Sequence, residues 1–222
     1  MKNFRLFLSF LIFAGVLSFF SLFKIQVAIA ATEKSASQLN LKGYWAFNEG
    51  TGTQVGDMSG NGNTATTTGS PTWVSGKMQK GMNFDSVDDC ARIQTTSNLE
   101  AGTNFSVSAW FTNADTGTTE RYITGKYGSS GNQAWLLGKS ISSTGDFGFQ
   151  VRTGAGVNAT AAISSNQYND GKWHYAVGVK SGTSLTLYVD GVSVGSGSNG
   201  SITSTSSTGD MEIGAIVGCS NL

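Results

Sequence analysis

Hydrophobic and polar residues alternate most clearly over residues 173–180, where Trp173, Tyr175, Val177 and Val179 alternate with His174, Ala176, Gly178 and Lys180. A period of two predicts a β-strand with one buried face. A short turn at 181–184 precedes Leu185, Leu187 and Val189, which resume the alternation. Asp190-Gly191 then predicts a hairpin turn, because both central positions of such a turn need positive φ.

Segments of the same kind recur along the chain and predict further strands at 43–49, 82–84, 90–94, 105–112, 122–126, 134–137, 147–152, 159–163 and 211–216. Turn-forming residues separate them about every ten positions, which is typical of an antiparallel β-sandwich or jelly roll. Residues 193–209 are rich in Gly, Ser and Thr and predict a long loop. Four tryptophans fall within strand periods and are predicted to lie in the core: Trp45, Trp110, Trp135 and Trp173.

The chain has 222 residues, a length that fits one domain and an N-terminal addition. Lys2 and Arg5 precede an uncharged apolar run at 6–23, and Ala28-Ile29-Ala30 is a small-x-small site. This pattern predicts either a cleaved signal peptide or an uncleaved membrane anchor over residues 1–30. Residues 31–41 are a predicted linker and 42–222 the folded domain. In both cases the domain is expected to be secreted or at the cell surface.

The charged residues indicate which binding partners to expect, and the cysteines indicate whether a disulfide can form. Without residues 1–30 the chain keeps 11 basic and 14 acidic residues, and the basic ones are scattered. Nucleic acid is therefore not an expected partner, and a membrane is one only through an uncleaved N-terminal segment. Cys90 and Cys219 are the two cysteines. In an exported chain they permit one disulfide, and the alternative is two buried thiols.

Seven segments, in order along residues 43–216, resemble the LamG-like jellyroll family of the concanavalin A-like lectin/glucanase superfamily. They are 44–50 (YWAFNEG), 57–63 (DMSGNGN), 81–85 (GMNFD) with Asp88-Asp89, 105–110 (FSVSAW), 171–174 (GKWH), 187–191 (LYVDG) and 213–215 (IGA). The resemblance implies an all-β fold, a two-sheet antiparallel jelly-roll β-sandwich of concanavalin A type.

The sequence departs from this family in two places. Cys90 stands where many relatives have a Tyr. The family also continues past Ile-Gly-Ala into a further strand, whereas this chain stops at Leu222. The sequence therefore predicts a C-terminally truncated sandwich that lacks its last strand, unless another segment pairs at that edge.

Asp57, Ser59 and Asn61 place oxygen-bearing side chains two residues apart, as in the first half of a calcium loop. The twelfth position from Asp57 is Thr68 and not the Glu of an EF-hand. Relatives of this fold often bind a structural Ca²⁺, so the resemblance implies a calcium site at Asp57. The alternative is an Asx turn in which Asp57 caps its own backbone.

The sequence offers no catalytic constellation, so we expect the protein not to be an enzyme. His174 is the one histidine, and no Gly-x-Ser-x-Gly elbow accompanies it. Glycoside hydrolysis needs two carboxylates at a fixed separation. The glutamates are isolated in sequence, and Asp85, Asp88 and Asp89 cluster at a predicted turn where solvated acids are common.

Aromatic residues outside the strand periods are the candidates for stacking on a ligand: Trp73, Tyr127 and Tyr168. The resemblance implies a non-catalytic exported recognition or adhesion module that binds carbohydrate or a cell-surface or extracellular protein. The alternatives are a structural spacer within a larger surface protein and, third, a glycan-active enzyme. Fold alone does not choose among them.

Overall fold

The computed structural model describes residues 40–94, 99–115, 121–127, 133–139, 146–152, 158–163, 168–202, 209–215 and 219. Within these residues the chain forms fourteen antiparallel strands. Their bounds are β1 Gln54–Val55, β2 Ala65–Thr68, β3 Thr72–Ser75, β4 Lys80–Asn83, β5 Cys90–Ile93, β6 Phe105–Thr112, β7 Arg121–Tyr127, β8 Gln133–Lys139, β9 Phe147–Arg152, β10 Asn158–Ile163, β11 Trp173–Ser181, β12 Ser184–Val189, β13 Val192–Ser198 and β14 Met211–Ile213. Within these residues no helix is long and apolar enough to cross a membrane. The chain divides into two units, residues 1–41 and 42–222, and the strands belong to the second.

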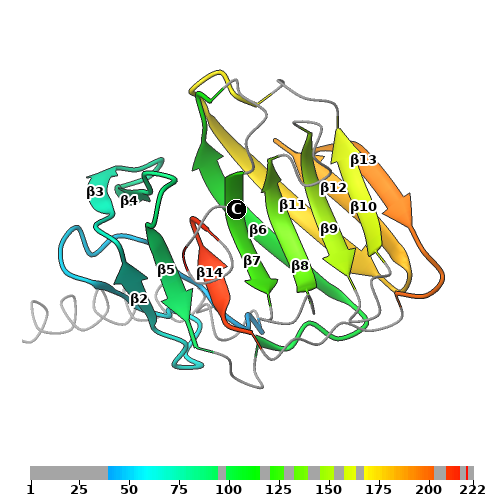
Figure 1. Cartoon of the computed structure of the whole chain (residues 1–222), viewed down its shortest axis with the longest axis horizontal. Helices are drawn as coiled ribbons and strands as arrows, with labels where there is room; N and C mark the ends of the chain where they lie inside the picture. Colours follow the sequence, from blue (N-terminus) through cyan, green and yellow to red (C-terminus); the bar gives the residue numbers. More distant parts are fainter. Residues whose placement is uncertain are drawn as a thin grey trace, which may run out of the picture. The chain divides into compact units, whose positions relative to one another are not determined.

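The strands build two layers (Figure 1). One sheet has eight strands in the order β1-β2-β5-β14-β7-β8-β9-β10, and the other has four in the order β13-β12-β11-β6. In Figure 1 strands β7 to β10 lie in front of the four-stranded sheet, and the hairpin β3-β4 stands apart. The predicted all-β antiparallel jelly-roll sandwich is confirmed. The prediction that its last strand is missing stays a prediction.

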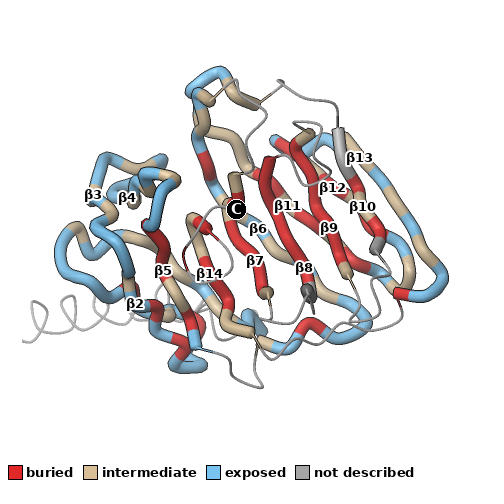
Figure 2. Tube along the Cα trace, viewed as in Figure 1, coloured by how far each residue is buried: buried red, intermediate tan, exposed pale blue. Residues whose placement is uncertain are grey.

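The core fills the space between the two sheets. Leu185, Leu187 and Val189 of β12 are almost fully buried, as the alternation of that strand predicts. Leu137 and Phe149 face them from β8 and β9, at 0% exposure. Figure 2 shows β9 and residues 135–139 of β8 buried along most of their length, and β7 buried over much of its middle. Strand β9 is buried from Phe147 to Val151, so both of its faces are covered.

Strand β11 alternates as predicted, but the side that faces the core is the one with small residues. Ala176 is 0% exposed and Gly178 is buried. A Cβ atom added to Gly178 would lie 2.5 Å from the ring of Phe149. The large rings of β9 therefore leave room only for small residues opposite them. Tyr175, Val177 and Val179 consequently point away from the core.

Two secondary-structure predictions are wrong. Residues 43–49 form no strand: Trp45 makes one isolated bridge with Asp57, and Phe47 has a φ of 54°. The ring of Phe47 packs against Trp73 and Phe84, which fixes this turn of the chain. The predicted loop at 193–209 begins with strand β13.

Strand β13 is poor in hydrophobic residues because it passes close to the other sheet. It pairs with β12, and a Cβ atom at Gly197 would collide with the backbone carbonyl of Thr160 in β10. Small residues are therefore a requirement of this position and not a sign of a loop. The strands β1, β2 and β3 were also not predicted.

Candidate functional site

The outward side chains of β6, β11 and β12 form a surface that we call the outer face. It consists of Ser106, Ser108, Trp110, Thr112, Trp173, Tyr175, Val177, Val179, Thr186 and Tyr188. Cross-strand register pairs Trp110 with Tyr175 and Val177 with Tyr188. Because directly opposed side chains in a sheet contact one another, the register places the rings together.

Trp110 is the most exposed ring of this face, at 41% of its surface. The centroids of the Trp110 and Tyr175 rings lie 5.1 Å apart, and the ring planes are tilted by 39°. The prediction that Trp110 lies in the core is therefore wrong. Trp135 is buried, and Trp45 packs half-buried against the core, as predicted. Trp173 was also predicted to lie in the core, and this prediction is wrong as well: Trp173 is half-buried on the outer face, beside Gly81 of the β3-β4 hairpin.

The sequence of β6 contained the signal for Trp110. On that strand Ser106, Ser108 and Thr112 share its parity, and Phe105 to Phe111 supply the opposite, apolar set. The polar set faces outward, and Trp110 belongs to it by position. The prediction placed Trp110 in the core because the residue is hydrophobic, although its position in the strand matches the polar side.

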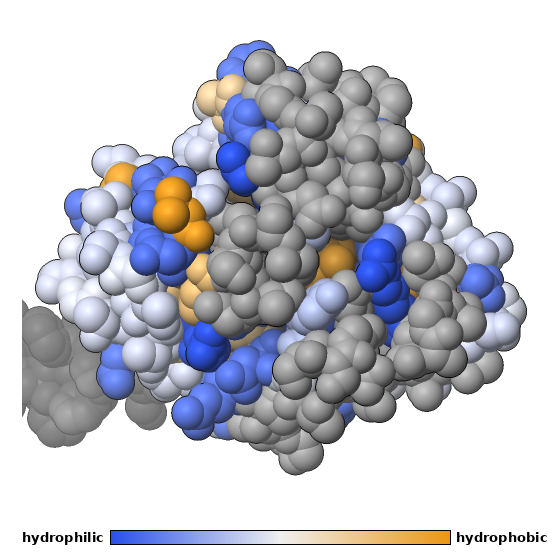
Figure 3. Space-filling model, viewed as in Figure 1, coloured by the Kyte–Doolittle hydropathy of each residue, from blue (hydrophilic) through white to orange (hydrophobic). Residues whose placement is uncertain are grey.

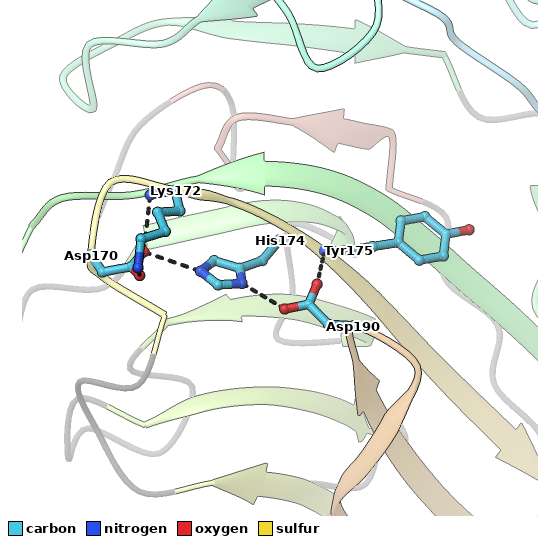
Figure 4. Close-up of polar contacts among 5 residues, drawn as sticks. All are labelled: Asp170, Lys172, His174, Tyr175 and Asp190. Carbon is cyan, nitrogen blue, oxygen red and sulfur yellow. Dashed lines mark hydrogen bonds and ion pairs between the residues drawn. The ribbon is translucent and has the colours of Figure 1, made fainter.

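Behind the outer face, His174 lies between two carboxylates (Figure 4). Its Nδ1 is 2.7 Å from Oδ2 of Asp190, and its Nε2 is 3.1 Å from Oδ1 of Asp170. Figure 4 shows the imidazole and the Tyr175 ring leaving β11 on opposite sides. The other oxygen of Asp190 accepts the backbone N–H of Tyr175 at 2.9 Å. The imidazole also contacts the ring of Tyr168, with centroids 4.9 Å apart.

These contacts set the charge of the cluster. Burial lowers the pKa of His174, but the hydrogen bonds with Asp190 and Asp170 outweigh it, so the pKa lies above its ordinary value. The hydrogen bond from His174 lowers the pKa of Asp190. Hydrogen bonding to Lys172, 2.8 Å away, lowers the pKa of Asp170. Both imidazole nitrogens are engaged, so the cluster fastens the Asp190-Gly191 turn to β11 and offers no free base.

That turn has the predicted form. Asp190 has a φ of 51° and Gly191 a φ of 83°, so both central positions adopt the left-handed region. The backbone N–H of Asp190 donates to the carbonyl of Tyr175 at 2.9 Å. The Asp-Gly motif thus holds the backbone beside one ring of the outer face.

Asp57 organises the loop from 57 to 63. Its Oδ1 accepts the backbone N–H groups of Tyr44 and Ser59, and its Oδ2 accepts that of Asn63, all at 2.9–3.0 Å. The bond from Ser59 is the Asx turn considered from the sequence. Burial raises the pKa of Asp57, but hydrogen bonds from Ser59 and from backbone N–H groups outweigh it and lower the pKa. The calcium site at Asp57 stays a prediction.

The acidic cluster before β5, which consists of Asp85, Asp88 and Asp89, also accepts hydrogen bonds from backbone N–H groups. Oδ1 of Asp89 accepts the N–H of Ser70 at 2.6 Å, and its Oδ2 accepts the N–H of Asp85 at 3.0 Å. Oδ1 of Asp85 accepts the N–H of Val87 at 2.8 Å. One oxygen from each of Asp85, Asp88 and Asp89 lies within 4.8 Å of the others. These bonds describe a carboxylate-stabilised turn.

Cys90 and Cys219 form a disulfide with Cα atoms 5.2 Å apart, which confirms the predicted bridge. Arg92 and Glu212 lie beside it and pair at 3.1 Å. Oε2 of Glu212 also accepts the backbone N–H of Cys219 at 3.3 Å. The sulfurs are bonded to each other, so this cluster closes the chain covalently.

The three rings predicted to stack on a ligand are each packed against other side chains. Trp73 lies in β3, donates from Nε1 to the carbonyl of Gly52 and contacts Phe47. Tyr127 ends β7 and packs against a small cluster of Tyr122 and Leu136. Tyr168 packs against the main core. None of the three belongs to the outer face, and their role in binding stays a prediction.

On the face of the molecule seen in Figure 3 the coloured residues are mostly hydrophilic, and hydrophobic side chains gather near β3 to β5. The exposed hydrophobic residues include Val74, Met78 and Val87 in that part of the chain. Isolated exposed residues of this kind are usual in soluble domains. The outer face differs because its rings contact one another.

Comparisons with known proteins agree with this fold. Residues 85–219 match the family model Laminin_G_3, described as the concanavalin A-like lectin/glucanases superfamily. A search of curated protein sequences found no match. Similar solved structures include the binding domain of Paraclostridial Mosquitocidal Protein 1, with a TM-score of 0.63 and 14% identity over 76% of this chain and 44% of that one. The chain thus spans less than half the length of that domain.

Two further structures are similar. The botulinum neurotoxin serotype D binding domain has a TM-score of 0.56 and 14% identity, over 72% of this chain and 40% of that one. Domain 4 of AbnA, an extracellular arabinanase of family GH43 from Geobacillus stearothermophilus solved in complex with arabinotriose, has a TM-score of 0.52. Its identity is 16%, over 78% of this chain and 82% of that one. At these identities the likeness concerns the fold.

Proposed function

The chain belongs to the concanavalin A-like lectin/glucanases superfamily, and from this premise we propose that it is a non-catalytic exported module that binds carbohydrate through the outer face. The single observation that carries the proposal is the exposed ring of Trp110 in contact with the half-buried ring of Tyr175. An aromatic ring offers a flat apolar surface to the C–H groups of a sugar ring. The fold does not need a ring at position 110, since the outward neighbours of Trp110 on the same strand are serine and threonine.

The polar residues of the outer face favour carbohydrate over protein as the ligand. Hydroxyl groups of Ser106, Ser108 and Thr112 surround the rings on β6, and all three are exposed. A ligand site of this kind combines apolar contact with a few polar groups that orient the ligand. The centres of protein–protein interfaces are instead depleted in serine. The arabinotriose complex of the similar arabinanase domain supports the same class of ligand.

The roles of the clustered acids support a binding function without catalysis. Asp85 and Asp89 accept backbone N–H groups within a turn, and His174 has both ring nitrogens engaged by carboxylates. A general acid or base needs a proton-transfer position open toward a substrate. The outer face carries rings and hydroxyls, which suit binding by apolar contact and hydrogen bonds.

Affinity electrophoresis in native gels that contain soluble polysaccharides tests the proposal, with protein purified after expression of the full chain. We expect arabinan, xylan or polygalacturonate to retard the wild-type protein. Trp110→Ala should weaken binding about tenfold or more, because rings at the centre of a contact dominate its energy. Tyr44→Ala is the matched control, since Tyr44 is 39% exposed and lies outside the outer face.

Two results would contradict the proposal. If Trp110→Ala kept full binding at an unchanged melting midpoint, the binding site would not include Trp110. No retardation of the wild type by any of the three polymers would favour a structural spacer instead.

A further inference from the structure

Lys77 lies over one ring of the outer face, that of Trp110. It lies in the turn between β3 and β4, and its Nζ is 5.0 Å from the centroid of the Trp110 ring. The side chain is exposed, and it takes part in none of the ion pairs between described residues. An ammonium over an indole ring is held by the ring's quadrupole, and at an exposed site this attraction is weak.

The ten side chains that make up the outer face carry no formal charge. Two carboxylates lie at its margin, and both are engaged by other side chains. Asp190 contacts His174, and Asp170 contacts both His174 and Lys172. Lys77 therefore gives the surface around Trp110 its local positive charge, and Asp190 feels that charge as well.

A sugar that stacks on the indole must share the ring with the Lys77 ammonium. A neutral sugar would displace the ammonium and offer it hydroxyl and ring oxygens as hydrogen-bond acceptors, but no opposite charge. A sugar with a carboxylate would displace it and then pair with it, because the lysine stem is flexible and its charge is compact. The arrangement thus discriminates between ligands by charge.

Resting on the function proposed above, we propose that Lys77 determines specificity at the outer face and that the ligand is an acidic polysaccharide of the uronic acid class, with its carboxylate on Lys77 and a sugar ring on Trp110. We infer this class of ligand from charge complementarity. The outer face has uncharged rings and hydroxyls and one ammonium group over Trp110, and a uronic acid offers a sugar ring and a carboxylate to match them.

The test compares two polymers with the same sugar backbone, polygalacturonate with its free carboxylates and the fully methyl-esterified, uncharged form, in affinity electrophoresis at pH 7. At low salt we expect the wild type to bind the acid form at least fivefold more tightly. Added salt should reduce the preference, because an exposed ion pair is screened. Lys77→Gln should bind both forms equally, and Lys77→Glu should prefer the ester. Lys80→Gln, at the start of β4 in the same hairpin, should keep the wild-type preference.

The outcomes separate this inference from the proposed function. Equal binding of the two forms by the wild type, or an unchanged preference in Lys77→Gln, would overturn the role of Lys77. Binding of arabinan but of neither galacturonate polymer would also overturn it. In those cases a loss of binding in Trp110→Ala would still uphold carbohydrate recognition. Absence of binding to every polymer would overturn both.

Discussion

Replacing Gly178 with alanine tests why β11 turns its aromatic side outward. The added Cβ would lie 2.5 Å from Cγ and Cδ2 of Phe149, closer than real Cβ contacts, and Phe149 is itself 0% exposed. The ring belongs to a strand that is covered on both faces, so it has little room to move. We therefore expect Gly178→Ala to destabilise the folded protein.

The magnitude follows from two opposing terms. Forcing a methyl group into a well-packed core costs about 1–3 kcal/mol. Replacing glycine by alanine restricts the unfolded chain and returns about 0.4–1 kcal/mol where the backbone accepts it. The packing term is larger, so the net loss is on the order of 1–2 kcal/mol. Gly102→Ala is the matched control, because nothing lies within 4 Å of its added Cβ.

Urea unfolding followed by tryptophan fluorescence measures both variants. A shift of the midpoint at constant slope reports a change in stability. Gly178→Ala should unfold at lower urea than the wild type, and Gly102→Ala at the same or higher urea. Phe149→Leu should cost less stability in the Gly178→Ala background than alone, because the two sites are coupled. A Gly178→Ala variant as stable as the wild type would refute the packing argument.

Three further predictions concern pH, redox state and calcium. The pKa of His174 is raised on folding, so its stabilising contribution is complete below about pH 6.5 and is lost as the pH rises through the folded-state value; melting curves from pH 5.5 to 9 should show this decline, and His174→Gln should flatten it. Reducing the Cys90–Cys219 disulfide, which joins residues 129 apart, should cost about 4–5 kcal/mol in the chain-entropy model, and an unchanged midpoint in reductant would contradict this. Calcium bound at Asp57 should raise the melting midpoint and Asp57→Asn should remove the rise, whereas equal midpoints at saturating calcium would reject the site.

The sequence predicts strands well where one face is clearly apolar. Strands β6 and β9 have the predicted bounds, and β12 alternates as expected. Prediction from the sequence fails where a strand's residues are determined by contacts with the opposite sheet. The glycine content of β13 indicates a loop until Gly197 is seen against the backbone of Thr160.

The candidate site escaped prediction because periodicity shows that two faces exist but not which of them is buried. On β11 the hydrophobic side is the outer one, since Phe149 fills the space above Gly178. That information lies on β9, about thirty residues away in the sequence and across the core in space. On β6 the alternating serines indicate which side of the strand faces solvent, and Trp110 lies on the same side as they do. The cross-strand contact of Trp110 with Tyr175 depends on register, which only the paired strands define.

The outer face asks for an explanation beyond folding. Burial in the core explains Phe149 and Leu187, because both are fully enclosed. It does not explain Trp110, which keeps 41% of its surface in solvent while serine occupies the equivalent outward position two residues earlier. Leaving 41% of the ring exposed forgoes part of the free energy of burial, which is roughly 1.5–3 kcal/mol for an apolar side chain that is buried completely. A second ring beside it and an ammonium above it recover part of that energy, yet both leave the indole accessible. A surface that keeps rings, hydroxyls and one charge within reach of solvent is better accounted for by a ligand than by the stability of the sandwich.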